Sequence, residues 1–245
     1  MKIKVLGSGS KGNSTLVETT SCNILIDAGL PLKNIEKRIN NTLPKIDILI
    51  ITHTHVDHIK CIKPVIKKYK PIILTLANDL QELIPNKVTT EEEYQIDNVN
   101  IKLFKLSHDV ECCGAIIKEN DRELVYITDT GYLSRKVLSK IKEKNIYIIE
   151  SNHDEEMLRN GRYPFYLQQR IRSDKGHLSN KACKDYLKNI IGDNTKYIVL
   201  AHLSEENNKE EIVEQTINDM LKQKQNKVNK VYIAKQDEAL ETIEV

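Results

Sequence analysis

Six consecutive residues place three imidazoles and one carboxylate in one short segment, His53-Thr54-His55-Val56-Asp57-His58. They follow a continuous apolar run, Ile46–Thr52, which is typical of a strand covered on both faces. With 7 His in 245 residues, independent placement would produce this spacing in about 3 × 10⁻⁴ of chains. Neutral imidazole and carboxylate are ligands that Zn²⁺, Mn²⁺ and Fe accept. The motif therefore predicts a metal site at the end of a buried strand.

Three more candidate ligands stand where predicted strands end. Each is weak evidence alone, because a His or Asp at a strand end is often a capping or surface residue. Together they repeat the arrangement at Asp57, and we expect them to complete the site. They are His108 after Ile101–Ser107, Asp129 after Leu124–Thr128 and His202 after Tyr197–Ala201.

The order of the remaining elements predicts an α/β fold. Early strands pair as hairpins and later ones alternate with helices, which indicates a four-layer αββα sandwich formed by one domain, residues 1–245. The expected strands are Lys2–Leu6, Thr15–Thr19, Cys22–Asp27, Ile46–Thr52, Pro71–Thr75, about four between Tyr94 and Ile127, Ile146–Glu150, Tyr197–Leu200 and Lys230–Ala234. The expected helices are Asn34–Ile39, Lys60–Tyr69, Asp79–Ile84, Ser134–Lys144, Ser179–Ile190 and Lys209–Lys224.

Composition is ordinary for a globular protein, with 40% apolar and 29% charged residues. The N-terminal segment lacks a secretory-signal pattern, and runs such as Ile48–Ile51 are far shorter than the roughly 18–20 apolar residues of a membrane span. We therefore expect a cytoplasmic protein with no membrane partner. A net charge of +2 neither requires nor excludes nucleic acid.

The five cysteines, Cys22, Cys61, Cys112, Cys113 and Cys183, show no Cys-x-x-Cys spacing. An odd, scattered set without a signal peptide predicts reduced thiols, not a disulfide framework. Cys61 lies close to the histidines in sequence, so it is either a further ligand or a helix residue facing the core. We favour the core position, because buried free cysteine is common.

The order His-x-His-x-Asp-His, then a lone His, Asp and His, resembles the ligand order of the metallo-β-lactamase superfamily. The resemblance implies two divalent metal ions, Zn²⁺ or Mn²⁺ with Fe also possible. It also implies that Asp27, in Ile-Leu-Ile-Asp-Ala-Gly, orients the histidine loop from behind the ligands. One metal would be held by His53, His55 and His108, the other by Asp57, His58 and His202, with Asp129 bridging them.

Several segments outside the ligand set resemble the YycJ/WalJ subgroup of that superfamily, over roughly Lys2 to Asn208. This resemblance implies a nuclease with exonuclease-like action on DNA. One departure is Glu111-Cys112-Cys113-Gly114, where the subgroup more often has Pro before a small apolar residue, and it affects the loop after His108. The segments that carry the resemblance are the Gly/Ser loop Gly7–Ser14, Ile149–Asp154, Gly161–Pro164, Gly176–Asn180 and Ala201–Ser204.

Two residues outside the metal ligands are candidates for proton transfer. The pattern Glu150…His177…His202 resembles ribonuclease Z over short motifs, which implies that a Glu and a His assist the leaving group. His177 follows Gly176 at a predicted helix start, where it could protonate a leaving oxygen beside free backbone N–H groups. The alternative is a capping histidine. His153 is interpreted as structural.

Candidate substrate contacts form two groups. The segment Arg159–Lys175 mixes basic and aromatic side chains, which suit phosphates and unpaired bases, although a solvated basic face over core aromatics is the alternative. The Gly/Ser loop resembles a phosphate cradle but lacks a Walker-type Lys-Ser/Thr pair, so we place it at the rim of the active site. The substrate-binding candidates are Ser8, Ser10, Asn13, Arg162, Arg170 and Arg172.

These features lead to one main functional hypothesis, a metal-dependent phosphodiester hydrolase acting on single-stranded or frayed DNA. Asp57, His177 and Glu150 are its expected catalytic residues. The first alternative is a small-molecule hydrolase of the same fold, a thioesterase or cyclic phosphodiesterase. The second is a non-enzymatic regulatory or scaffold protein, against which the intact ligand set counts. The sequence leaves open which metal is bound, whether the substrate is DNA or RNA, from which end it is cleaved and what the oligomeric state is.

Overall fold

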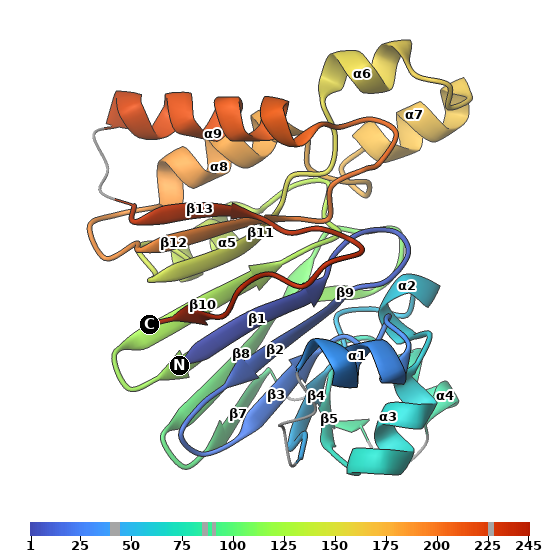
Figure 1. Cartoon of the computed structure of the whole chain (residues 1–245). Coiled ribbons are helices and arrows are strands. Elements are labelled where there is room, and N and C mark those ends of the chain that lie inside the picture. The colour runs from blue at the N-terminus through green and yellow to red at the C-terminus, as the bar shows by residue number, and fades with distance from the viewer. Residues whose placement is uncertain (40–44, 85–87, 90–91, 225–227) are drawn as a thin grey trace.

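Two mixed β-sheets stack face to face, with helices on their outer surfaces, in the computed structural model of the chain (Figure 1). The structure describes residues 1–39, 45–84, 88–89, 92–224 and 228–245. One sheet has the strand order β14-β1-β2-β3-β4-β5-β6, and the other has the order β13-β12-β11-β10-β9-β8-β7. The predicted α/β class and the αββα layering are confirmed.

The first sheet changes from antiparallel to parallel at β3. Strands β1, β2 and β3 pair antiparallel, whereas β3, β4, β5 and β6 pair parallel. The carboxyl ends of β3 and β4 therefore lie at the same edge of the sheet. Its strands are β1 (Lys2–Gly7), β2 (Ser14–Glu18), β3 (Asn23–Ile26), β4 (Ile48–Ile50), β5 (Ile72–Leu74), β6 (Val88–Thr89) and β14 (Ile243–Glu244).

The second sheet has the same mixed character. Strands β7 to β10 form an antiparallel meander, and β10 to β13 run parallel. The carboxyl ends of β10, β11 and β12 therefore share one edge as well. Its strands are β7 (Glu93–Ile96), β8 (Val99–Leu106), β9 (Cys112–Glu119), β10 (Arg122–Ile127), β11 (Ile146–Glu150), β12 (Tyr197–Ala201) and β13 (Lys230–Ile233).

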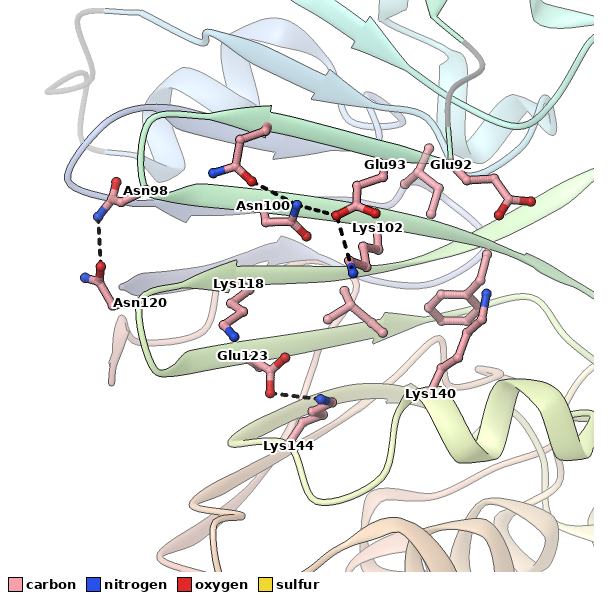
Figure 2. A pocket seen from close by; sticks show the side chains of 14 residues that line it. Glu92, Glu93, Asn98, Asn100, Lys102, Lys118, Asn120, Glu123, Lys140 and Lys144 are labelled. Carbon is pink, nitrogen blue, oxygen red and sulfur yellow. Dashed lines mark hydrogen bonds and ion pairs between the residues drawn. The ribbon is translucent and has the colours of Figure 1, made fainter.

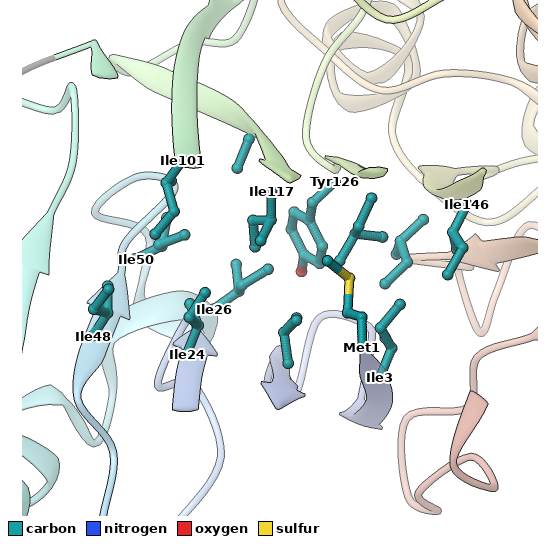
Figure 3. Close-up of a cluster of buried hydrophobic side chains, with 14 of the residues drawn as sticks. Met1, Ile3, Ile24, Ile26, Ile48, Ile50, Ile101, Ile117, Tyr126 and Ile146 are labelled. Carbon is teal, nitrogen blue, oxygen red and sulfur yellow. The ribbon is translucent and has the colours of Figure 1, made fainter. Parts of the chain in front are cut away.

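The main core lies between the two sheets and is built largely from isoleucine (Figure 3). Ile24 and Ile48 from the first sheet belong to one buried cluster with Ile101 and Ile117 from the second. All three residues of β4 are fully buried, because the opposite sheet covers one face and helices cover the other. This burial explains the continuous apolar run before the histidine motif and holds the loop that follows it.

Helices cover the outer faces of both sheets (Figure 1). Two others, α6 (Glu155–Asn160) and α7 (Phe165–Arg172), lie beyond the end of the second sheet and were not expected from the sequence. Both are short, α6 buries only Leu158 and α7 buries none of its residues, so neither packs as the covering helices do. The covering helices are α1 (Leu32–Arg38), α3 (Ile62–Tyr69) and α4 (Leu80–Leu83) on the first sheet and α5 (Arg135–Lys140), α8 (Asn180–Ile190) and α9 (Glu210–Lys224) on the second.

All five cysteines lie in the described part of the chain and are free thiols, as predicted. Cys61 is only partly buried at the start of α3 and belongs to none of the described groups of candidate metal ligands. Within the described ranges, no helix combines the length and the apolar character that a membrane span needs.

Candidate metal centre and active site

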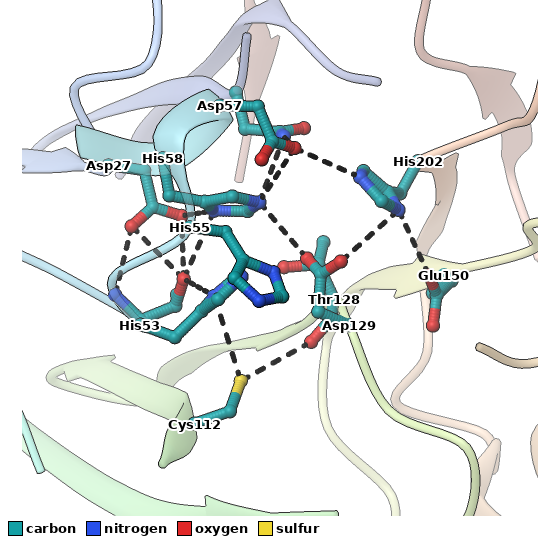
Figure 4. Close-up of polar contacts among 12 residues, drawn as sticks. Asp27, His53, His55, Asp57, His58, Cys112, Thr128, Asp129, Glu150 and His202 are labelled. Carbon is teal, nitrogen blue, oxygen red and sulfur yellow. Dashed lines mark hydrogen bonds and ion pairs between the residues drawn. The ribbon is translucent and has the colours of Figure 1, made fainter. Parts of the chain in front are cut away.

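The histidine motif leaves β4 and turns directly into α2 (Val56–Ile59), a single short helix at the edge of the first sheet (Figure 4). His53 and His58 are fully buried, whereas His55 and Asp57 are partly exposed. The turn therefore carries two buried imidazoles at its base and a third imidazole and a carboxylate nearer to solvent.

The second sheet brings further polar side chains to the same place. Strands β10, β11 and β12 are in register, with Ile127 opposite Ile149 and Glu150 opposite Ala201. Their carboxyl ends thus place the next side chains, Asp129, Glu150 and His202, side by side. His108, two residues after β8, groups with His53 and His55 of the first sheet.

The candidate ligand atoms form overlapping groups in which all atoms lie within 4.8 Å of one another. Asp129 belongs to one group with His53 and His58 and to another with His202, so it lies between the two sets that the resemblance implies. A further group adds Glu150 and His177 to Asp129 and His202. The two implied sets are each found as a group, His53 with His55 and His108, and Asp57 with His58 and His202.

Buried polar atoms without hydrogen-bond partners mark the same position. Among the described residues, His53 Nε2, Asp129 Oδ2 and His202 Nε2 are such atoms. A buried polar atom left unpaired costs about 1–3 kcal/mol, so native proteins rarely keep several together without an ion or water. The donor set is imidazole nitrogen and carboxylate oxygen, which fits divalent metal ions.

A network behind the ligands fixes the orientation of two imidazole rings. Asp27, at the end of β3, lies with Oδ2 2.8 Å from His58 Nδ1, and its Oδ1 accepts the Thr52 N–H at 2.9 Å. Thr52 Oγ1 lies 3.0 Å from His53 Nδ1. Because Nδ1 of both rings is engaged, their Nε2 atoms are directed at the centre.

The Gly/Ser loop reaches the centre from the opposite side. Asn13 is fully buried, and its Nδ2 donates to Asp57 Oδ2 at 3.1 Å while lying 3.0 Å from His58 Nε2. Buried Ser8 accepts the His202 N–H at 2.9 Å through Oγ and donates to Asn13 Oδ1 at 3.2 Å. Ser10 is exposed and lines the nearby cavity. Of the three predicted substrate-binding residues in this loop, Ser8 and Asn13 thus contact the ligand shell, and Ser10 lies at its rim.

Glu150 connects two histidines at the other side of the centre. Its Oε1 lies 2.7 Å from His177 Nδ1 and 3.0 Å from His202 Nδ1, and His177 Nδ1 lies 3.6 Å from Asp129 Oδ1. The expectation that His177 stands at a helix start is wrong, because α8 begins at Asn180. The His177 N–H donates instead to Ile171 O at 2.9 Å, which holds the loop before α8 against α7.

The charges of these groups follow from burial and from their neighbours. Burial, helped by the nearby His58, lowers the pKa of His53 to about 2, so that its ring is neutral as metal binding requires. Burial opposes ionisation of Glu150, but the adjacent His177 holds the pKa of that carboxyl at about 2. Burial also opposes protonation of His177, yet Glu150 raises the pKa of that imidazole above its ordinary value.

A cavity of about 230 Å³ opens beside His177 and His202. Arg170 lines it from α7, together with Tyr163 just before that helix. Arg170 also forms an ion pair with Asp109, whose Oδ1 lies 3.2 Å from His108 Nε2. Arg162 and Arg172 are exposed and do not line the cavity, so the structure brings one of the three predicted arginines to the site itself.

A larger cavity of about 740 Å³ lies elsewhere, on the outer face of β7 to β10 (Figure 2). Its polar lining contains Lys102 paired with Glu93 at 3.3 Å and Lys144 paired with Glu123 at 2.9 Å. No candidate ligand or predicted substrate-binding residue lines it. Size alone therefore does not identify the functional site of this protein.

Sequence reasoning missed several residues of the site. Asp109 reaches both His55 and His108, and Asn152 Nδ2 donates to His202 O at 2.9 Å. Cys112 Sγ lies 3.9 Å from His53 Nδ1, beneath the ligand. Asp109 follows a ligand directly and Asn152 follows Glu150 by two positions, so adjacency to site residues was the available signal.

A model of the β-lactamase superfamily domain matches residues 22–202, which include every candidate metal ligand. The chain belongs to the metallo-β-lactamase superfamily. This membership confirms two predictions. One is the fold inferred from the ligand order, and the other is the class of the protein, a metal-dependent hydrolase.

Similar proteins narrow the relationship within the superfamily. Exodeoxyribonuclease YycJ of Bacillus anthracis is 36% identical over 239 residues, covering 91% of this chain and 90% of the relative. Exodeoxyribonuclease WalJ of Streptococcus pneumoniae is 34% identical over 238 residues, covering 91% and 88%. The metallo-beta-lactamase fold protein YhfI from Bacillus subtilis matches with a TM-score of 0.72 at 18% identity, covering 98% of this chain and 99% of that one, which supports the fold. The predicted resemblance to the YycJ/WalJ subgroup is confirmed.

Proposed function

We propose that this protein is an exonuclease-like phosphodiesterase that acts on single-stranded or frayed DNA. The observation that carries the proposal is the position of His177, which is bound to Glu150 and lies 3.6 Å from the candidate bridging ligand Asp129. The relatives from Bacillus anthracis and Streptococcus pneumoniae, which span most of the chain, are named exodeoxyribonucleases. We further propose that the protein acts in the cytoplasm, the location expected from its sequence.

Two divalent ions, when held by the two ligand sets around Asp129, supply an activated water at neutral pH and charge stabilisation for a phosphodiester. The residues of the chain orient the reaction around them. Asn13 holds Asp57 through Oδ2, which leaves the second carboxylate oxygen to accept a proton from the attacking water. Glu150 holds His177 through Nδ1, which leaves Nε2 to protonate the departing oxygen of the sugar.

Substrate contacts are assigned in the same proposal. Arg170 lines the cavity beside His177 and would contact a phosphate next to the scissile bond. Ser10 at the rim offers a hydroxyl to the same backbone. Arg162 and Arg172 lie farther out on an exposed face and would add longer-range attraction for the strand.

The decisive experiment uses purified protein, end-labelled single-stranded DNA and either Mn²⁺ or Zn²⁺, with EDTA as the metal control. We expect stepwise loss of nucleotides from one end. Asp129→Asn, which removes the candidate bridging carboxylate, should abolish this activity. The matched control Asp219→Asn changes an exposed carboxylate on α9 and should cleave like the wild type.

Two results would overturn the proposal. One is the absence of metal-dependent DNA cleavage in a protein shown to contain metal. The other is turnover of S-lactoylglutathione or of a cyclic nucleotide without any action on DNA, which would support the small-molecule hydrolase instead.

A further inference from the structure

Helix α7 exposes two aromatic side chains next to the active-site cavity. Phe165 is 72% exposed and Tyr166 is 74% exposed, the highest values among the large apolar or aromatic side chains described as exposed. Phe165 is one of only two phenylalanines in the chain, and its ring faces solvent. Exposed aromatic side chains side by side are typical of binding surfaces.

Helix α7 carries both rings and also contributes Leu167, Arg170 and Ile171 to the lining of the cavity, although the rings themselves do not line it. Tyr163 lines the cavity and precedes Phe165 by two residues, which limits the separation of their Cα atoms to about 7 Å. Tyr166 stands four residues before Arg170, so the two side chains share one side of the helix. Arg170 lines the cavity that contains His177.

The surrounding charge selects one kind of occupant. Arg159, Arg162, Arg172 and Lys175 are all exposed, and Asp174 is the one acidic residue between Arg159 and Lys175. This segment is more positive than the chain as a whole, whose net charge is +2, so the remainder of the chain is slightly acidic. A basic surface with exposed aromatic rings is complementary to a strand that offers phosphates and unstacked bases.

The helix is also tied to the metal-ligand loops. The Arg170 guanidinium pairs with Asp109, and the His177 N–H donates to Ile171 O at 2.9 Å. These contacts join α7 to the residue after His108 and to the proposed proton donor. The exposed rings are therefore held at a fixed position relative to the site of cleavage.

We infer that Phe165 and Tyr166 form a stacking platform for unpaired nucleotides of the substrate strand, one or more positions away from the scissile phosphate. This inference rests on the proposed function and adds to it the surface that recognises single-stranded ends. Binding to the platform would be independent of base sequence, because every base has a face that stacks on an aromatic ring. It would favour unpaired over base-paired ends, because paired bases are not free to stack on the rings.

Kinetics on substrates of different length test the platform. The double variant Phe165→Ala/Tyr166→Ala should raise KM for single-stranded oligonucleotides about 10-fold or more, since each stacked base contributes substantially to binding. Turnover of thymidine 5′-p-nitrophenyl phosphate, which ends at the cleaved bond, should stay unchanged. The variant Phe165→Tyr/Tyr166→Phe keeps both rings and should retain wild-type KM. Lys118→Ala/Lys140→Ala, in the separate cavity of Figure 2, is the control for removal of side chains elsewhere.

A binding measurement gives a second readout that does not depend on catalysis. The chain has no Trp, so Tyr166→Trp would introduce a single indole as a reporter. Its fluorescence should be quenched by oligothymidine with phosphorothioate linkages and much less by a blunt duplex of equal length. Ile72→Trp places the reporter at an exposed position at the start of β5 and should not respond.

The outcomes separate this inference from the proposed function. Equal KM for the double alanine variant and wild type on long single strands, with active cleavage by both, would overturn the platform and leave the nuclease proposal intact. If neither the wild type nor any variant cleaved DNA, the proposed function itself would be overturned. Sedimentation that shows a dimer lost in Phe165→Ala/Tyr166→Ala would assign the rings to a second copy of the chain and overturn the platform.

Discussion

Asn13 donates a hydrogen bond to Asp57 at 3.1 Å between residues 44 positions apart in sequence. The contact joins the Gly/Ser loop of the first hairpin to the histidine turn, and Asn13 also lies 3.0 Å from His58 Nε2. The same oxygen, Asp57 Oδ2, lies 3.4 Å from His58 Nε2 and 3.6 Å from His202 Nε2, so the buried amide holds the oxygen that faces the other candidate ligands. Asn13 is therefore a positioning residue.

Substitution of this amide should weaken metal binding without unfolding the protein. Asn13→Ala removes the donor to Asp57, and loss of such an orienting partner typically costs 10–100-fold in metal affinity or activity. Metal content after dialysis against a graded chelator series measures the effect. Ser10→Ala, an exposed neighbour in the same loop, is the control. Wild-type metal retention by Asn13→Ala would show that Asp57 needs no such support.

The pair Glu150 and His177 predicts a dependence on the leaving group. His177→Ala should lower kcat on oligonucleotides about 10²–10⁴-fold, because an alkoxide leaves poorly without a proton. Bis-p-nitrophenyl phosphate releases a stable phenolate that needs no proton. The activity of His177→Ala on this substrate should therefore fall far less. Metal content should equal that of the wild type. A uniform loss on both substrates would mean that His177 supports the site in some other way.

Gly29 fits under the histidine turn with no room for a side chain. A Cβ atom there would lie 1.6 Å from Asp57 O and 2.7 Å from Asn13 N, both backbone atoms. Gly29→Ala should therefore destabilise the fold by about 3 kcal/mol or more and displace the turn. Thermal unfolding with metal analysis measures both effects. In Gly192→Ala the new atom meets the flexible Glu143 side chain, so a much smaller loss is expected.

Glu119 predicts a pH dependence of stability away from the site. Burial opposes its ionisation, but Thr20 donates to it through N–H at 2.6 Å and Oγ1 at 2.9 Å, and the net result is a lowered pKa. Since the folded pKa lies below the unfolded one, the stabilisation is present above about pH 4.3 and is lost as pH falls.

Urea unfolding of wild type and Glu119→Gln, both with chelator present, tests this dependence. The wild type should be more stable by about 1.5–3 kcal/mol at pH 7, the range for hydrogen bonds to a charged group. That difference should shrink towards pH 3. If the difference in unfolding free energy between wild type and Glu119→Gln were the same at pH 7 and pH 3, protonation of Glu119 would not be linked to unfolding.

Much of the fold and of the ligand set could be predicted because strand ends leave a local signal. The apolar run before His53 and the strand before Asp129 are readable without knowledge of their neighbours, and the fold follows from their order. Helix α7 was not predicted, because it spans only eight residues, buries none of them fully and has just one i, i+4 apolar pair, Leu167 and Ile171, as a signal. The contacts of Asn13 could not be predicted either, since they join distant positions. Its Gly-rich surroundings instead indicated a loop at the rim of the active site, with Asn13 as a substrate contact.

The backbone itself carries part of the cost of this site. Asp27, Asp129 and His202 each follow a strand and adopt left-handed conformations, with φ of 60°, 58° and 55°. Such a conformation costs a non-glycine residue about 1–2 kcal/mol. A thermostability redesign guided by backbone geometry would choose glycine at all three positions. The redesigned backbone would be free of that cost, but the protein would lose the carboxylate that pairs with His58 and Thr52, the candidate bridging carboxylate and a candidate imidazole ligand together.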